Sequence, residues 1–147
     1  MDLTKPGTYP RSGRETLGGM LFLPRSIDKM RAHIAGTAGE YKALTGMSDQ
    51  LFDLFGVTAD QFQEAVAANI GDDGVLQWLY THGRQPAPGA IEAYNAQLLA
   101  HTPATEERMA RFRADLASAG HGDRTDVTTF MDKQDLEEGR KVPRRDG

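Results

Sequence analysis

The chain has 147 residues, the length of one ordinary domain, and carries a net charge of −4 with 26% charged residues. This acidic balance lacks the basic footprint of a nucleic-acid-binding protein. The absence of cysteine excludes disulfides, thiol catalysis and thiolate metal ligands. The apolar clusters are too short to cross a bilayer and no targeting segment is visible. We therefore expect a cytoplasmic protein with neither nucleic acid nor a membrane as its partner.

The N-terminal part is predicted to be an extended arm followed by a short turn of helix. Residues 1–11 are polar and include Pro6 and Pro10, a composition typical of an arm. Ser12 and Glu15 have the spacing of a helix capping box, and the glycines at 18–19 would end the short helix that it opens. The apolar run at 20–23, MLFL, is too short to distinguish a helix from a strand.

The rest of the chain has the periodicity of helices. A helix is predicted from Leu23, where Pro24 suits the first turn, to the glycine at 36. Caps, apolar residues at helical spacing and glycine stops predict further helices over about residues 48–55, 58–70, 72–82, 91–99, 105–116 and 130–136. The period-two alternation of strands is missing. The sequence predicts an all-α fold, a compact single domain over residues 1–147 with six to eight mostly short helices, an extended arm at 1–11 and a polar tail at 140–147.

No motif of a known metal, phosphate or nucleophile site occurs. The zincin pattern, the Glu-x-x-His pair of di-iron bundles, the Walker A loop and the nucleophile elbow are all missing. The glycine-rich stretch at 36–39 follows a helix instead of opening one, so it is interpreted as a helix stop. The loop at 118–126 contains His121, Asp123 and Asp126, and is interpreted as a solvated loop. We expect neither a metal nor a cofactor.

The predicted helix that starts at Leu23 has an unusual second face. One face is apolar and consists of Leu23, Ile27, Met30 and Ile34. The opposite side combines charged residues with small ones, namely Arg25, Asp28, Lys29, Ala32, Ala35 and Gly36. A solvent-facing surface does not need so many small residues, so we expect another segment to pack closely there. The charges would then lie at a buried or half-buried boundary.

Buried charges must be paired or used, and two interpretations follow. In the structural one, Asp28 neutralises Arg25 and Arg31, each three positions away along the helix, and fixes how the arm docks. In the functional one, the cationic excess of Arg25, Lys29 and Arg31 faces a pocket and binds an anion. Spacing alone favours the structural interpretation.

Several segments of this sequence resemble a known family. They are YPRSGRETLGG (9–19), LPRSIDKMRAHIAGTAGEY (23–41), SDQLFDLFGV (48–57) and TFMDKQDLEEGR (129–140). Together they are similar to the bacterial domain-of-unknown-function family 5069, and the resemblance covers nearly the whole chain. It implies a small α-helical domain and supplies no general activity. Its pattern positions include Arg11, Tyr41 and Trp78, and they raise the functional interpretation to the level of the structural one.

The function predicted on this basis is a metal-free small-molecule enzyme or metabolite-binding protein. Its pocket would lie between the arm and the helix that starts at Leu23, and its ligand would be a small anionic or carbonyl-bearing metabolite. The candidate catalytic residues are Asp28 as a general base, with Lys29 and Tyr41 as proton donors. The candidate ligand-binding residues are Arg25, Arg31, His33, Arg11 and Trp78.

The alternative is a non-catalytic protein-interaction module. Here the helix charges form a structural ion-pair network, and the polar arm and basic tail, both expected to be mobile, bind a partner protein. An extended arm is also compatible with a homodimer formed by exchange of the arm.

Overall fold

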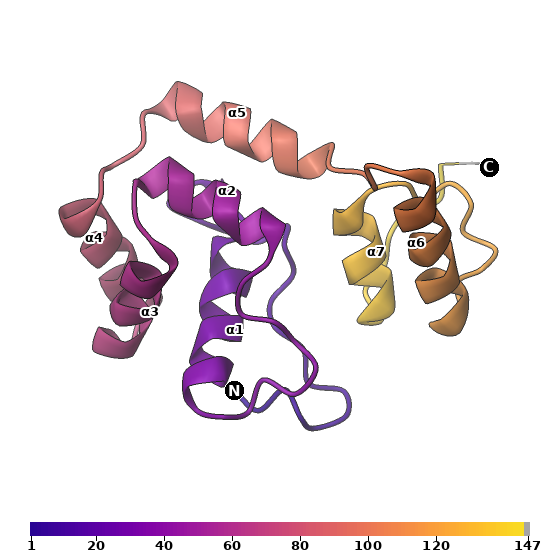
Figure 1. Ribbon diagram of the computed structural model, residues 1–147, viewed down its shortest axis with the longest axis horizontal. Helices are drawn as coiled ribbons and strands as arrows, with labels where there is room; N and C mark the ends of the chain where they lie inside the picture. The colour runs from indigo at the N-terminus through magenta and orange to yellow at the C-terminus, as the bar shows by residue number, and fades with distance from the viewer. Residues whose placement is uncertain (146–147) are drawn as a thin grey trace. The chain divides into compact units, whose positions relative to one another are not determined.

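The computed structural model describes residues 1–145, which are mostly helical as predicted (Figure 1). They form two compact units, Met1–Ala96 and the part of the chain from Gln97 onward, which are described separately. The single domain over residues 1–147 stays a prediction. The first unit contains the strands β1 (Thr16–Leu17) and β2 (Met20–Leu21) and the helices α1 (Leu23–Ile34), α2 (Gly46–Phe55), α3 (Ala59–Ala68) and α4 (Asp72–His82). Helix α5 (Pro88–Leu99) runs across the boundary, and the second unit contains α6 (Glu106–Ser118) and α7 (Phe130–Glu137).

A small antiparallel hairpin stands where a short helix was predicted. One of the two predicted capping-box bonds forms, since the Ser12 amide donates to Glu15 Oε2 at 3.2 Å, whereas Ser12 Oγ accepts from the Arg14 amide at 3.1 Å instead of from the Glu15 amide. The chain then reverses at Gly18 and Gly19, whose φ angles are 60° and 81°. Two consecutive residues with positive φ form the tight turn that matches strand twist. The hairpin pairs Thr16 with Leu21 and Leu17 with Met20.

Helix α1 is buried over residues 23–30 and at Ala32, whereas Ala35 and Gly36, two of the small residues that predicted a covered second face, are exposed. Every residue from Leu23 to Met30 is buried, including Arg25, Asp28 and Lys29 at 3–5% exposure. The helix packs against α3 and β1. Ile34 is an exception to the predicted apolar face, because it lies in the last turn and is 43% exposed.

The corner between α3 and α4 brings an acidic residue back towards α1. Helix α3 begins with the predicted capping box, in which Thr58 Oγ1 accepts from the Gln61 amide and Gln61 Oε1 accepts from the Thr58 amide. It ends at Asn69, and α4 begins two residues after the exposed Ile70. Asp72 is therefore in the first turn of α4, at the end of the helix where a negative charge is favoured.

The second unit has its own apolar core, and the tail is part of it. The buried residues of this core are Phe112, Leu116, Val127, Leu136 and Val142. Two arginines hold the tail in place: Arg144 Nη1 lies 3.0 Å from Asp123 Oδ2, and Arg145 Nη1 lies 2.6 Å from Asp132 Oδ2. Residues 140–145 therefore contact the second unit, the expected mobility of the tail stays a prediction, and residues 146–147 lie outside the described residues.

None of the helices within residues 1–145 combines the length and the hydropathy that crossing a bilayer requires.

Candidate functional site

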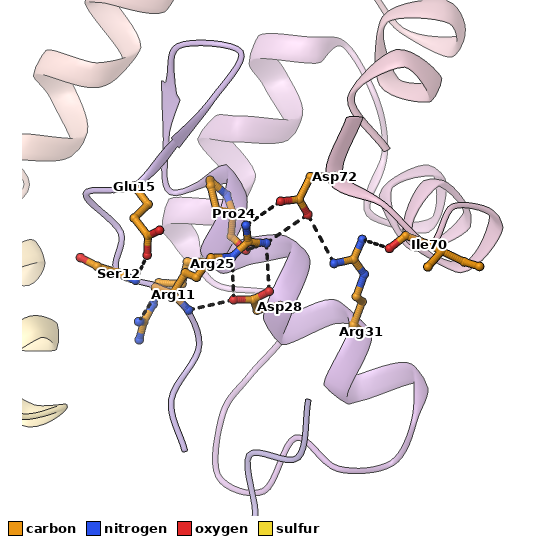
Figure 2. A network of polar contacts seen from close by, with 9 residues as sticks. All are labelled: Arg11, Ser12, Glu15, Pro24, Arg25, Asp28, Arg31, Ile70 and Asp72. Atoms are coloured by element: carbon orange, nitrogen blue, oxygen red, sulfur yellow. Dashed lines mark hydrogen bonds and ion pairs between the residues drawn. The ribbon is translucent and has the colours of Figure 1, made fainter. Parts of the chain in front are cut away.

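Arg11 of the N-terminal arm is the centre of a network of charged side chains (Figure 2). Its guanidinium donates to both carboxylate oxygens of Asp28 on α1, from Nε to Oδ2 and from Nη2 to Oδ1, each at 3.0 Å. The backbone amide of Arg11 also donates to Asp28 Oδ2, at 2.8 Å. Asp28 therefore accepts three hydrogen bonds from one residue of the arm. A bidentate pair of this kind fixes orientation as well as distance.

The same guanidinium reaches α4. Its Nη1 lies 2.5 Å from Asp72 Oδ2, and its Nη2 donates to Asp72 Oδ1 at 3.1 Å. Nη2 also donates to the Pro24 carbonyl at 3.3 Å. Arg11 thus binds two carboxylates that come from different helices, a geometry that suits the planar guanidinium with its several donors.

Arg31 on α1 is the second arginine that binds Asp72. Its Nη1 lies 3.3 Å from Asp72 Oδ1, and its Nη2 donates to the Ile70 carbonyl at 2.7 Å (Figure 2). Two arginines, at 11 and 31, therefore face two aspartates, at 28 and 72, so the charges of this group cancel.

The predicted pairing of Asp28 with Arg25 and Arg31 along the helix is wrong. Asp28 binds Arg11, and Arg31 binds Asp72. The reason is that Arg11 offers a backbone amide and two guanidinium donors together, whereas a neighbour on the same helix offers a single side chain. Arg25 donates instead to the Arg11 carbonyl, at 3.2 Å, and its guanidinium lies 5.8 Å from the centre of the Tyr41 ring.

Within the network, Arg11 and Asp72 favour the ionised form of each other. Hydrogen bonds from Arg11 are the main cause that lowers the pKa of Asp72 below its ordinary 3.8, with the charges of Arg11 and Arg31 acting in the same direction and partial burial opposing them. The hydrogen bond to Asp72 is in turn the main cause that raises the pKa of Arg11. The Asp28 side chain is 7% exposed and that of Asp72 is 26% exposed. As it stands, this group anchors the arm to α1 and α4.

The chemistry open to the predicted catalytic residues follows from these contacts. Asp28 accepts three hydrogen bonds from Arg11, and its role as a general base stays a prediction. Lys29 is 4% exposed, and its ammonium lies 5.5 Å from the centre of the Phe22 ring. Its role as a proton donor also stays a prediction. Within residues 1–145, no group of three histidine or acidic side chains is placed to hold a metal ion.

A hollow of about 540 Å³ lies between the arm and the loop after α1. Residues 3–9 of the arm and residues 39–41 of the loop line it. Tyr41 is the one predicted site residue among them, and no residue of α1 lines the hollow, so the pocket predicted between arm and helix stays a prediction. The arm is held at both ends of this hollow. At one end the Leu3 amide donates to the Thr37 carbonyl at 2.8 Å and Thr37 Oγ1 donates to the Met1 carbonyl at 2.9 Å; at the other end stands Arg11.

Two predicted ligand-binding residues lie away from both features. His33 is exposed in the last turn of α1. Trp78 stacks on His82, with ring centres 3.8 Å apart, and the His82 Nδ1 lies 2.9 Å from the Trp78 carbonyl oxygen. Trp78 therefore belongs to the surface of α4, where it covers the end of the helix.

The charged and aromatic residues of the network and the hollow that had not been predicted are Asp72, Lys5, Tyr9 and Glu40. Asp72 carried a signal, because it stands at a helix start, but this signal is equally that of an ordinary cap. Lys5, Tyr9 and Glu40 stand in irregular segments, where no periodicity shows which side chains meet.

Comparison with known proteins identifies the family. No curated protein matches this chain in sequence. The model of a domain of unknown function (DUF5069) matches residues 7–140, a range that begins in the arm and includes Arg11, Asp28, Arg31 and Asp72. The matched range also contains all seven helices found in residues 1–145. The chain belongs to the DUF5069 family.

Proposed function

We propose that this protein binds a small molecule in the hollow between the arm and the loop after α1. The observation that carries this proposal is the hollow itself, whose volume of about 540 Å³ is that of a small-molecule site, since such sites measure roughly 300–1,000 Å³. Its lining combines two tyrosines, at 9 and 41, with a lysine at 5 and two threonine hydroxyls, at 4 and 8. Aromatic faces with a few polar groups are the usual lining of a ligand site.

The ion-pair network supports this proposal as the anchor of one wall. A binding site loses affinity when a wall must become ordered on binding. Here the arm is fixed before any ligand arrives, because Leu3 is bonded to Thr37 and Arg11 is bonded to Asp28 and Asp72. The buried charges of the network then have a role in binding without touching the ligand.

This proposal assigns different roles to the residues that the sequence singled out. Tyr41 contacts the ligand, and Arg25 supports its ring from α1. Arg11, Asp28 and Arg31 position the arm and the α3–α4 corner.

The test is an NMR titration of the full chain with a panel of carboxylates, amines, amino acids and neutral sugars, each at millimolar concentration. We expect at least one compound to shift the amides of residues 4–9 and 39–41 in a saturable way. Tyr9→Ala should weaken that binding, because Tyr9 is 39% exposed and lines the hollow. Lys42→Ala is the control, since Lys42 is exposed and follows Tyr41 without lining the hollow. A panel without any compound that shifts these amides would refute the proposal.

A further inference from the structure

We propose further, on the basis of the proposed function, that the ligand of the hollow is a zwitterion of the amino-acid class with an apolar side chain. The lining carries one cationic residue, Lys5 on the arm, and one anionic residue, Glu40 on the loop. These charges come from the two segments that face the same space. A ligand with a carboxylate and an ammonium group matches both of them.

The two charges are available to a ligand. Within the part of the chain that the structure describes, neither Lys5 nor Glu40 takes part in an ion pair, and they are not paired with each other. The charge of Lys5 acts on the carboxylate of Asp2 through space, as one of the smaller causes that lower the pKa of Asp2. By contrast, the charged side chains of the network already bind one another. The hollow is therefore the place where a ligand finds a cation and an anion that do not neutralise each other directly.

A ligand with a single charge fits this lining less well. A plain carboxylate would gain the attraction of Lys5 and would also meet the repulsion of Glu40, and a plain amine would meet the reverse. Both lining charges are exposed to solvent, so each contributes modestly, and we expect a preference of about three- to tenfold over either singly charged analogue.

The uncharged part of the lining indicates the rest of the ligand. The rings of Tyr9 and Tyr41 and the ring of Pro6 offer apolar faces, and tyrosine faces also attract an ammonium group. An amino acid with an aromatic side chain would place its ring on these faces and its two charges between Lys5 and Glu40.

The experiment compares three probes that differ by one charge: phenylalanine, 3-phenylpropionate, which lacks the ammonium group, and phenethylamine, which lacks the carboxylate. Each is titrated into the full chain and followed at the amides of residues 4–9 and 39–41. We expect phenylalanine to bind about three- to tenfold more tightly than the other two. Lys5→Ala should remove its advantage over phenethylamine, and Glu40→Gln its advantage over 3-phenylpropionate. Lys42→Ala should change neither ratio.

The outcomes separate this inference from the function on which it rests. Equal or tighter binding of 3-phenylpropionate or phenethylamine would overturn the zwitterion and leave a small-molecule site. The same conclusion follows if all three probes fail while a neutral compound of the wider panel binds at these amides. If no compound of the wider panel shifts these amides, the proposed function itself fails, and the inference fails with it.

Discussion

Asp72 shares its carboxylate between two arginines, and its pKa is lowered mainly by the hydrogen bonds from Arg11. A group whose folded-state pKa lies below its unfolded value contributes stability that is present above the unfolded pKa and is lost as the pH falls through the folded one. The contribution of Asp72 to the free energy of unfolding should therefore be complete above about pH 5. It should be lost progressively as the pH falls below 3.8, the ordinary pKa of an aspartate.

Asp72→Asn tests this contribution. At neutral pH we expect the variant to lose about 1–2 kcal/mol of unfolding free energy, because Arg11 and Arg31 keep only a neutral acceptor. The difference from the wild type should shrink as the pH falls below about 4. Urea denaturation of both proteins between neutral and acid pH measures it.

The control is Asp73→Asn, because Asp73 is exposed in the same first turn of α4 and loses the same favourable interaction with the helix end. We expect it to cost no more than about 0.5 kcal/mol. Equal losses for the two variants would mean that the network contributes nothing beyond the helix end.

The sequence shows that charges are buried on α1 and does not show their partners. The small residues at 32, 35 and 36 predicted that the charged side of the helix is covered. Arg25, Asp28 and Lys29 are buried, as is Ala32, whereas Ala35 and Gly36 are exposed where the helix ends. The partner of Asp28 is 17 positions away and that of Arg11 on α4 is 61 positions away. Periodicity along one helix carries no information about partners so far away in the sequence. The prediction therefore paired Asp28 with the nearest opposite charges on the same helix.

At the scale of elements, three of the helices begin at side-chain caps of the kind that sequence rules recognise. Thr58, Thr105 and Thr129 each accept from the backbone amide three positions later, as sequence rules for helix starts require. The hairpin was missed for a related reason. A glycine with positive φ can end a helix or form a tight turn, and strands of two residues are too short to show alternation.

The arm is the element on which the proposed site depends, and Gly39 controls how closely it approaches the loop. Gly39 has a φ of 60°, and a Cβ there would lie 3.1 Å from the Leu3 carbonyl oxygen and 3.5 Å from the Thr4 Cα. Gly39→Ala should therefore push the arm away. We expect the Leu3 amide, which donates to Thr37, to exchange its hydrogen faster in the variant.

Gly36→Ala is the matched control for this prediction. Gly36 has a φ of 73°, and a Cβ there meets nothing within 4 Å. Both variants carry the cost of a left-handed alanine, about 1–2 kcal/mol, and only Gly39→Ala adds the clash, worth about 1–3 kcal/mol more. If hydrogen exchange at Leu3 accelerates equally in both, the close approach of arm and loop does not hold the arm.

At the scale of the whole molecule, the tail has two possible roles: it binds a partner protein, or it is part of the second unit. A polar, basic tail is a reasonable partner-binding segment when only the sequence is considered. In the second unit, however, Val142 is 7% exposed within the core, and Arg144 and Arg145 bind Asp123 and Asp132. Within residues 140–145, Val142 stands among four charged residues and a proline. A single apolar residue gives no periodic signal, so the burial of Val142 could not be predicted from the sequence.

Val142→Ala and a chain that ends after Gly139 should both destabilise the second unit. We expect Val142→Ala to cost about 1–3 kcal/mol, because it removes buried apolar area and leaves a cavity beside Phe112 and Leu116. The truncated chain should lose more, because it also loses the ion pairs of Arg144 and Arg145. Unfolding in urea, followed by NMR at the amides of α6 and α7, measures both effects.

Lys141→Ala is the control, since Lys141 is exposed beside Val142 and should change stability by less than about 0.5 kcal/mol. A truncated chain as stable as the wild type would show that the tail is dispensable for folding, and would return it to the role of a segment available to a partner.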